Sequence, residues 1–290
     1  MHKNSSKCAA AALTLATAFF SLPAAAVPYV VGGASQSLIS DSSQWAWDGS
    51  YMAPLRAALE NPANFGPSGI VNQEIDTVTL SAVNASTLAG IDMFVATWIS
   101  DGQAAPIAPS IVDFFLNGGD LFLLQDDAGH DGVGSALGLS TTASSGTVSN
   151  GGVPLFDGPF GVATDVMQLY LVGQLDPLAI AAHSGHVGGT NAQGQVTSAF
   201  WGAGEYAAGA GSLFVIADID MIADTGTQCG LAICGARFSP LNSNGIYALN
   251  TFSFLQQNSG GSVPVPEPAS LLLLSLGLGA LAFTRRRKRA

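Results

Sequence analysis

The chain has 290 residues, and nine Lys or Arg residues against twenty Asp or Glu residues give it a formal net charge of −11. Two of the nine cations are Lys3 and Lys7 and five lie at 285–289, so only Arg56 and Arg237 remain in the stretch 27–268. That stretch contains all twenty acidic residues and has a formal charge of −18. Phosphate recognition depends on Lys and Arg, so this composition argues against nucleic acid and anionic lipid headgroups as ligands.

Divalent cations, cationic polymers and neutral sugars remain compatible with such a charge. The alternative is that the carboxylates are simply solvated and keep a Gly- and Ala-rich exported domain soluble.

The first 26 residues have the layout of a secretory signal peptide. Lys3 and Lys7 precede an apolar run at 9–22, and Ala24-Ala25-Ala26 offers the small residues of a cleavage site. We expect signal peptidase to remove residues 1–26, so that the protein is exported.

Strand and helix patterns alternate through residues 27–255, which we expect to form one exported domain. Strands are predicted at 28–31, 77–80, 91–99, 121–124 and 212–219, and helices at 51–61, 107–116 and 246–255. Continuous apolar strands are typical of a sheet that is buried on both faces. The pattern predicts an α/β fold with a mostly parallel sheet and helices on both faces. Residues 141–211 are rich in Gly, Ser and Asn, and we expect irregular structure with some β there.

Aromatic residues are densest shortly after the first predicted strand, where Trp45, Trp47 and Tyr51 lie within seven residues. Aromatic faces stack on sugar rings or peptide groups, and they also serve simply to fill a core. Both interpretations stay open for this cluster.

A polar turn follows the predicted strand at 121–124, at the edge where open α/β sheets bind ligands. Two further carboxylates end the strand at 212–219. Carboxylate oxygens suit Ca²⁺ or Mg²⁺, and an imidazole suits a transition metal. A Ca²⁺ or other metal site here would draw on Asp126, Asp127, His130, Asp131, Asp218 and Asp220. The alternative is a polar turn in which Asp126 or Asp127 caps the helix that follows.

Other candidate sites are weaker. His183 and His186 are separated by three positions, but the glycines around them favour a solvated loop over a helical zinc site. Cys8 leaves with the signal peptide, so Cys229 and Cys234 are expected to form a disulfide in an oxidising compartment. The sequence has no Gly-x-Ser-x-Gly, phosphate-binding loop or dinucleotide fingerprint.

The order of strand, helix, Gly-Gly turn and strand at 91–95 and 111–124 resembles the core of class I glutamine amidotransferase-like domains, which have a flavodoxin-like fold. The segments 214–220 and 244–250 extend this resemblance. Amidotransferases place a nucleophilic Cys in the turn after a central strand, whereas the turn at 126–131 has neither Cys nor Ser. The resemblance therefore implies the fold without the catalytic Cys-His-Glu set.

The C-terminal part combines a flexible Gly- and Ser-containing linker at 256–265 with a three-part tail at 266–290. The tail consists of Pro266-Glu267-Pro268, an apolar run at 269–284 and a basic end at 285–289. This order resembles the PEP-CTERM sorting tail, which is read by a membrane protease of the exosortase type. The run of sixteen residues would give a helix of about 24 Å, apolar on every face, and the cations beyond it favour a cytoplasmic end.

These observations predict an exported protein, held in the membrane by its C-terminal helix until exosortase processes it, and then placed at the cell surface or outside the cell. The resemblance to PEP-CTERM proteins implies a milieu rich in exopolysaccharide. We expect a non-catalytic structural or binding domain of the envelope or extracellular matrix. The alternatives are a hydrolase that uses the carboxylates or a metal at 126–131, and a Ca²⁺-stabilised adhesin.

Overall fold

The five predicted strands form the parallel half of the sheet. The computed structural model describes residues 27–39, 43–144, 148–149, 153–164, 166, 172–224 and 238–259. The parallel strands are β1 (Tyr29–Ala34), β2 (Ile75–Leu80), β3 (Met93–Thr97), β4 (Asp120–Leu124) and β12 (Leu213–Ile216). They lie in the order β2-β1-β3-β4-β12, and each neighbouring pair is parallel. This is the 2-1-3-4-5 order of a doubly wound sheet, in which the direction of strand addition reverses between β1 and β3.

Antiparallel strands extend the sheet beyond β12. β11 (Val196–Trp201) pairs with β12, and it is followed by β10 (His186–Asn191) and then β6 (Val148–Ser149). β9 (Val172–Leu175) pairs with β11 and with β5 (Thr141–Ser144). A separate hairpin joins β7 (Asp157–Gly158) and β8 (Gly161–Val162). The region expected to be irregular thus contributes half of a mixed sheet.

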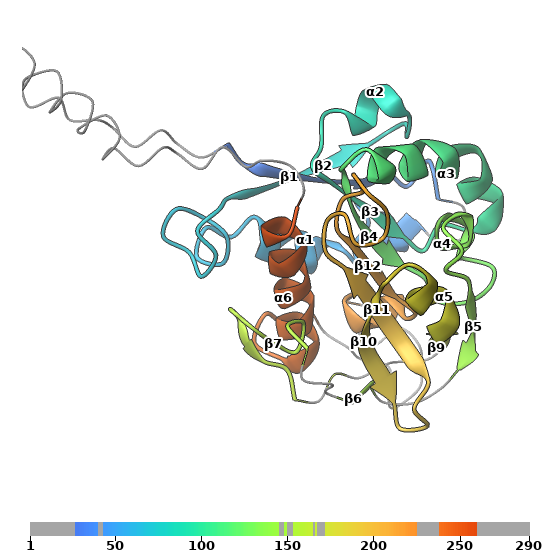
Figure 1. Ribbon diagram of the computed structural model, residues 1–290. Helices are drawn as coiled ribbons and strands as arrows, with labels where there is room; N and C mark the ends of the chain where they lie inside the picture. The colour runs from blue at the N-terminus through green and yellow to red at the C-terminus, as the bar shows by residue number, and fades with distance from the viewer. Residues whose placement is uncertain are drawn as a thin grey trace, which may run out of the picture. The chain divides into compact units, whose positions relative to one another are not determined.

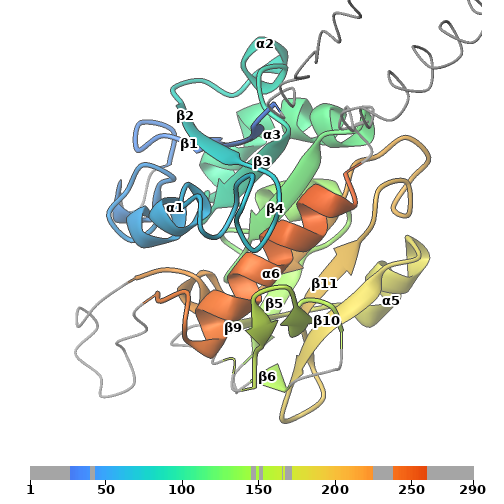
Figure 2. The ribbon, with the colours of Figure 1, turned by 90° about the vertical axis from the view of Figure 1, so that its left-hand side faces the viewer.

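Helices cover both faces of the sheet, as Figure 1 shows. The α-helices are α1 (Ala53–Leu59), α2 (Ala85–Leu88), α3 (Asp101–Leu116), α4 (Gly132–Ala136), α5 (Pro177–Ala182) and α6 (Ser243–Gln257), and the 3-10 turns are η1 (Ser43–Trp45) and η2 (Ile219–Met221). One hydrophobic core lies between the sheet and α1 and α6, and a second lies between the sheet and α2, α3, α4 and α5. Figure 2 shows α6 in front of the sheet, with α1 beside it.

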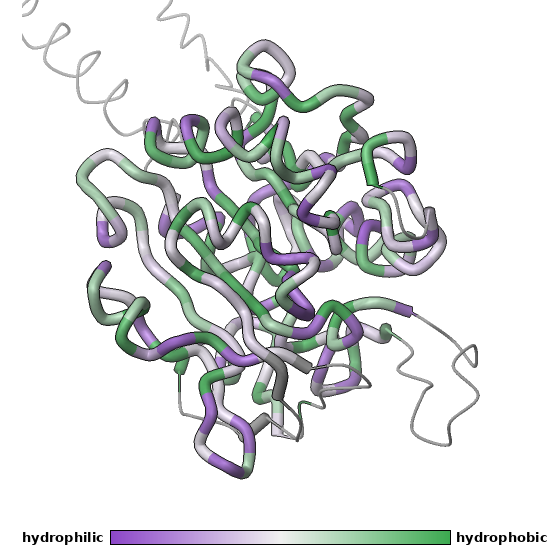
Figure 3. The backbone as a smooth tube through the Cα atoms, turned by 90° about the vertical axis from the view of Figure 1, so that its right-hand side faces the viewer, coloured by the Kyte–Doolittle hydropathy of each residue, from purple (hydrophilic) through white to green (hydrophobic). Residues whose placement is uncertain are grey.

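The strand side chains divide between the two cores by the two-residue period of a strand. In β4, Phe122 and Leu124 belong to the core under α6, whereas Leu121 and Leu123 belong to the core under α3. Because both faces are covered, the interior strands are apolar at most positions, and Figure 3 shows hydrophobic colouring along them. The α/β fold with a mostly parallel sheet is therefore confirmed.

Two helices extend beyond their predicted bounds. α3 begins at Asp101, six residues before the predicted start, and runs through Pro106 and Pro109. Each proline removes one backbone N–H donor, but the helix gains the burial of an apolar face that includes Ile107 and Ile111. α6 ends at Gln257, two residues into the segment expected to be a linker.

The predicted signal peptide, the Cys229–Cys234 pair and the tail at 266–290 lie outside the described residues. Within the described ranges, no helix combines the length and the apolar character that a membrane span requires.

Candidate ligand-binding rim

The carboxyl ends of the parallel strands bring together side chains that are far apart in the sequence. We call this the carboxyl rim, and it consists of Trp45, Tyr51, Trp98, Asp126, Asp127, His130 and Asp220. The segment after β1 supplies the first two, and the residue after β3 supplies the third. Since the strand order reverses between β1 and β3, these aromatic residues lie at the position where doubly wound sheets bind ligands.

The aromatic residues of the rim form one connected group. The ring centroids of Trp45 and Tyr51 are 4.8 Å apart, and those of Trp45 and Trp98 are 5.6 Å apart. Trp98 in turn stacks on His130, at 4.1 Å between centroids and 14° between planes. Trp45 and Trp98 are only partly buried, so part of this aromatic group faces solvent. Trp47, the third aromatic residue of the predicted cluster, is fully buried in the core instead.

Trp98 has an unusual backbone conformation. Its φ is 30°, a left-handed value that a bulky side chain rarely adopts. Its indole Nε1 has no hydrogen-bond partner among the described residues. A strained residue of this kind costs about 1–3 kcal/mol and is typical of ligand sites.

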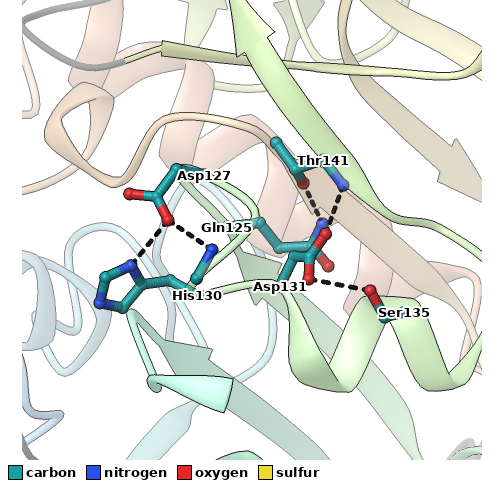
Figure 4. A network of polar contacts seen from close by, with 7 residues as sticks. Gln125, Asp127, His130, Asp131, Ser135 and Thr141 are labelled. Atoms are coloured by element: carbon teal, nitrogen blue, oxygen red, sulfur yellow. Dashed lines mark hydrogen bonds and ion pairs between the residues drawn. The ribbon is translucent and has the colours of Figure 1, made fainter.

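The turn after β4 is held by its own carboxylates, as Figure 4 shows. Asp127 Oδ1 accepts a hydrogen bond from the Gly129 N–H at 2.6 Å and lies 3.0 Å from His130 Nδ1. This contact fixes the imidazole against Trp98 and thereby orients the aromatic group.

Asp131 faces away from the aromatic group. Its carboxylate accepts hydrogen bonds from Ser135 Oγ at 2.8 Å and from the Thr141 N–H at 2.5 Å. Asp131 is also the N-cap residue of α4, although its side chain makes no capping hydrogen bond. The helix after the turn is therefore not capped by Asp126 or Asp127, the alternative that the sequence left open.

Asp126 and Asp220 are the buried carboxyls of the rim. Burial, together with the nearby charges of Asp220 and Asp127, raises the pKa of Asp126 to about 8. Burial also raises the pKa of Asp220 to about 6. Asp218 is fully buried, and its Oδ1 accepts the Asp220 N–H at 2.9 Å, which holds the η2 turn.

Several buried acceptors near the rim have no partner among the described residues. These are Thr97 Oγ1 at the end of β3, and Gln125 Oε1 and Asp126 Oδ1 just after β4. Gln125 and His130 also line a cavity of about 10 Å³, which is room for about one water. Thr97, Trp98 and Gln125 were not predicted as site residues, because each looks like an ordinary member of a strand or turn in the sequence.

The six residues predicted as a metal site are only partly brought together. Asp126, Asp127, His130 and Asp220 share the rim, whereas Asp131 and Asp218 hold local turns. Within the described residues, no three His, Cys, Asp or Glu side chains are arranged to hold a metal ion.

The two remaining histidines lie on the antiparallel half of the sheet. His183 follows α5 and stacks on Tyr206 at 4.1 Å, with 4° between the rings. His186 begins β10, and its Nε2 lies 3.1 Å from Glu205 Oε2. A short turn that begins at His183 thus joins α5 to β10, and His186 belongs to the strand rather than to the loop that the glycines suggested.

The opposite, amino end of the sheet contains one more buried carboxyl. Asp120 Oδ2 accepts a hydrogen bond from the Tyr29 hydroxyl at 2.5 Å, and Oδ1 accepts one from the Ser212 N–H at 2.6 Å. Burial raises the pKa of Asp120 to about 7, although both hydrogen bonds act to lower it.

Comparison with solved structures gave distant matches. The mmIFT52 N-terminal domain matches with a TM-score of 0.39 and 12% identity, over 64% of this chain and 85% of that chain. Exo-beta-1,4-mannosidase Op5Man5 from Opitutaceae bacterium strain TAV5 matches with a TM-score of 0.40 and 9% identity, over 67% of this chain and 31% of that chain. Both likenesses are too distant to carry an argument about function, and these neighbours do not support the resemblance to glutamine amidotransferase-like domains.

A search of curated proteins gave no match. Residues 264–288 match the PEP-CTERM protein-sorting motif, which confirms the tail recognised around Pro266, Glu267 and Pro268. The motif indicates an exported protein that is made as a membrane-anchored precursor and processed by exosortase.

Proposed function

We propose that this exosortase-sorted protein acts in the cell envelope or extracellular matrix, and that its α/β domain binds a saccharide at the carboxyl rim. The observation that supports the proposal is the partly exposed aromatic group of Trp45, Trp98 and His130 at the reversal point of the sheet. Aromatic faces of this kind offer an apolar surface on which a sugar ring can stack.

The charge of the domain narrows the class of ligand. Arg56 is the only Lys or Arg among the described residues, and the rim itself carries carboxylates. Phosphorylated and other anionic ligands would meet repulsion there. A saccharide without negative charge fits both the aromatic surface and the acidic surroundings, and it also fits the exopolysaccharide milieu that the sorting motif suggests.

Binding to oligosaccharides, measured by titration calorimetry, tests this proposal. Trp98→Ala and His130→Ala should each weaken binding about tenfold or more, which corresponds to about 1.4 kcal/mol. His183→Ala is the matched control, because His183 also stacks on an aromatic ring at 4.1 Å but lies outside the rim. Equal affinities for the wild type, His130→Ala and His183→Ala would contradict a saccharide site at the rim.

The mass of the protein recovered from its host tests export and sorting separately. We expect a species that begins near Val27 and ends near the Pro266–Pro268 turn, found outside the membrane. A species that retains residues 285–289 would mean that the tail is a permanent anchor.

A hydrolase is the second candidate, and one observation favours it. Asp126 and Asp220 lie at one site with pKa values raised unequally, to about 8 and about 6, and pairs of carboxyls with separated pKa values carry acid and base roles in hydrolases. If the rim is catalytic, saccharide products should form, and Asp126→Asn should abolish them without unfolding the protein. Binding without products would leave the non-catalytic proposal standing.

The finer description of the fold as glutamine amidotransferase-like is also a proposal. The strand order β2-β1-β3-β4-β12 supports it, and an experimental structure superposed on members of that family would test it.

A further inference from the structure

At this end of the sheet, three buried side-chain atoms without partners among the described residues can accept a hydrogen bond, while Trp98 Nε1 is a donor without such a partner. Thr97 Oγ1, Gln125 Oε1 and Asp126 Oδ1 can all accept a hydrogen bond, and the side chains that carry them are 0%, 2% and 5% exposed. The Gln125 amide nitrogen already donates to Leu139 O at 3.0 Å and to Thr141 Oγ1 at 2.5 Å. Unpartnered acceptors therefore outnumber the unpartnered Trp98 donor at this end of the sheet.

The same place also lacks a positive charge. Asp126 is close enough to Asp220 and Asp127 for their charges to raise its pKa, and among the described residues no cation lowers it. Buried carboxylates are ordinarily paired with a cation or with hydrogen-bond donors. In the described part of the chain the only Lys or Arg is Arg56.

One carboxylate of this group is within reach of a ligand. The Asp127 side chain is 37% exposed, and Figure 4 draws its contacts with Gly129 and His130 at a single oxygen. Asp127 Oδ1 lies 3.0 Å from His130 Nδ1, and the imidazole stacks on Trp98. A ligand on the aromatic group would thus have this carboxylate at its edge.

We propose that the saccharide bound at the carboxyl rim carries a free ammonium group, as an amino sugar does. The sugar ring stacks on Trp98 and Trp45, and the ammonium lies against Asp127 and Asp220. An ammonium group has three donors and no acceptor, which matches a site rich in unpaired acceptors. It is also attracted to the face of an indole ring. This inference rests on the saccharide-binding function proposed above and names its ligand class.

An uncharged sugar fits this position less well. Its hydroxyl groups each bring acceptor lone pairs together with one donor, and an N-acetyl group adds a carbonyl oxygen. These acceptors would face the oxygens of Asp127 and Asp126. The charge on the sugar nitrogen is therefore the feature that the site should distinguish.

Titration calorimetry with a glucosamine tetramer and with the N-acetylglucosamine tetramer tests the inference on the exported domain. We expect the wild type to bind the glucosamine tetramer about tenfold tighter or more, a difference of about 1.4 kcal/mol. Asp127→Asn and Asp220→Asn should each reduce this preference. Asp113→Asn, an exposed position near the end of α3, removes the same charge away from the rim and should keep the preference.

The outcomes separate this inference from the function on which it rests. Equal affinity for the two tetramers would overturn the ammonium site and leave saccharide binding intact. A preference that Asp113→Asn reduces as much as Asp127→Asn does would also overturn it, since the attraction would then come from the overall charge. Failure to bind either tetramer or any neutral oligosaccharide would overturn both proposals. Asp127 is exposed, so its variant remains informative even if Asp220→Asn fails to fold.

Discussion

The two ends of the parallel sheet treat a buried aspartate in opposite ways. At the amino end, Asp120 is 1% exposed, and each carboxylate oxygen accepts a hydrogen bond, from Tyr29 and from Ser212. At the carboxyl end, Asp126 is 5% exposed, and its Oδ1 has no partner among the described residues. Both aspartates are buried, but Asp120 is held by hydrogen bonds at both oxygens, whereas Asp126 keeps an oxygen without a partner among the described residues.

The surroundings of the two carboxyls strengthen this contrast. Asp120 joins β1, β4 and the start of β12, the strands that form the centre of the sheet. Asp126 lies near two further carboxyls and beside a strained, partly exposed tryptophan. Natural proteins accept such local costs mainly at functional sites. The comparison therefore supports a stabilising role for the amino end and is consistent with the ligand site that we propose at the carboxyl end.

The largest expected effect is on the pH dependence of stability. The folded-state pKa is about 7 for Asp120 and about 8 for Asp126, against a usual value of 3.8. Between pH 3.8 and its folded-state pKa, each of these carboxyls keeps a proton in the folded state that it has lost in the unfolded state. The free energy of unfolding therefore falls as the pH rises through this range. Each retained proton costs about 1.4 kcal/mol per pH unit. Thermal unfolding between about pH 5 and about pH 8 measures the slope.

Single variants assign this slope to the two ends. Asp120→Asn should remove one proton's share of the slope up to about pH 7, and Asp126→Asn should remove one proton's share up to about pH 8. Asp113→Asn, on the exposed face of α3, is the control and should leave the slope unchanged. A stability that rises with pH in this window would contradict the picture of two buried, proton-retaining carboxyls.

Removal of the amino-end carboxyl should have the next largest effect. Asp120→Ala leaves the Tyr29 hydroxyl and the Ser212 N–H buried without their acceptor, which should cost about 2–4 kcal/mol of unfolding free energy. Asp120→Asn keeps an acceptor and should cost much less. Asp126→Ala removes an oxygen that already lacks a partner, so chemical denaturation should show a smaller loss for it than for Asp120→Ala.

A smaller effect concerns the backbone strain at Trp98. In a left-handed conformation glycine has no Cβ to clash, so Trp98→Gly should be about 1 kcal/mol more stable than Trp98→Ala. In a helix or strand the order is usually the reverse, because Ala is more stabilising than Gly there. If Trp98→Ala proved the more stable of the two, the strain would be absent from the protein in solution.

The smallest expected effect is that of Ca²⁺. The carboxylates of Asp131 and Asp218 are already engaged in hydrogen bonds within their own turns. We therefore expect millimolar Ca²⁺ to change the melting temperature no more than Na⁺ of equal ionic strength does. A rise that is specific to Ca²⁺ and reversed by a chelator would favour the adhesin alternative instead.

The parallel half of the fold could be predicted because its strands are buried on both faces. The runs at 93–96 and 121–124 are apolar at every position, and few other structures bury such a run. The antiparallel half could not be predicted in detail, since several of its strands are short, with two residues in β6 and four in β9. Their position depends on pairing with distant strands, which leaves little trace in the local sequence.

The candidate site could be predicted only where polar or aromatic residues cluster in the chain. Asp126, Asp127 and His130 stand out after a strand, and so does Trp45 after another. Trp98 and Thr97 do not, because an aromatic residue and a threonine are ordinary at the end of a strand. Their significance comes from the backbone angle and the missing partner, which only the folded chain shows.

The four tryptophans of the chain offer the most direct test of the division between the two ends. Nuclear magnetic resonance of their indole N–H groups, during titration with a glucosamine tetramer, reports on each ring separately. We expect the indole N–H signals of Trp98 and Trp45 to shift, while those of the buried Trp47 and Trp201 should not. Shifts confined to Trp201, or no shift at Trp98 at saturating ligand, would contradict a binding site at the carboxyl rim.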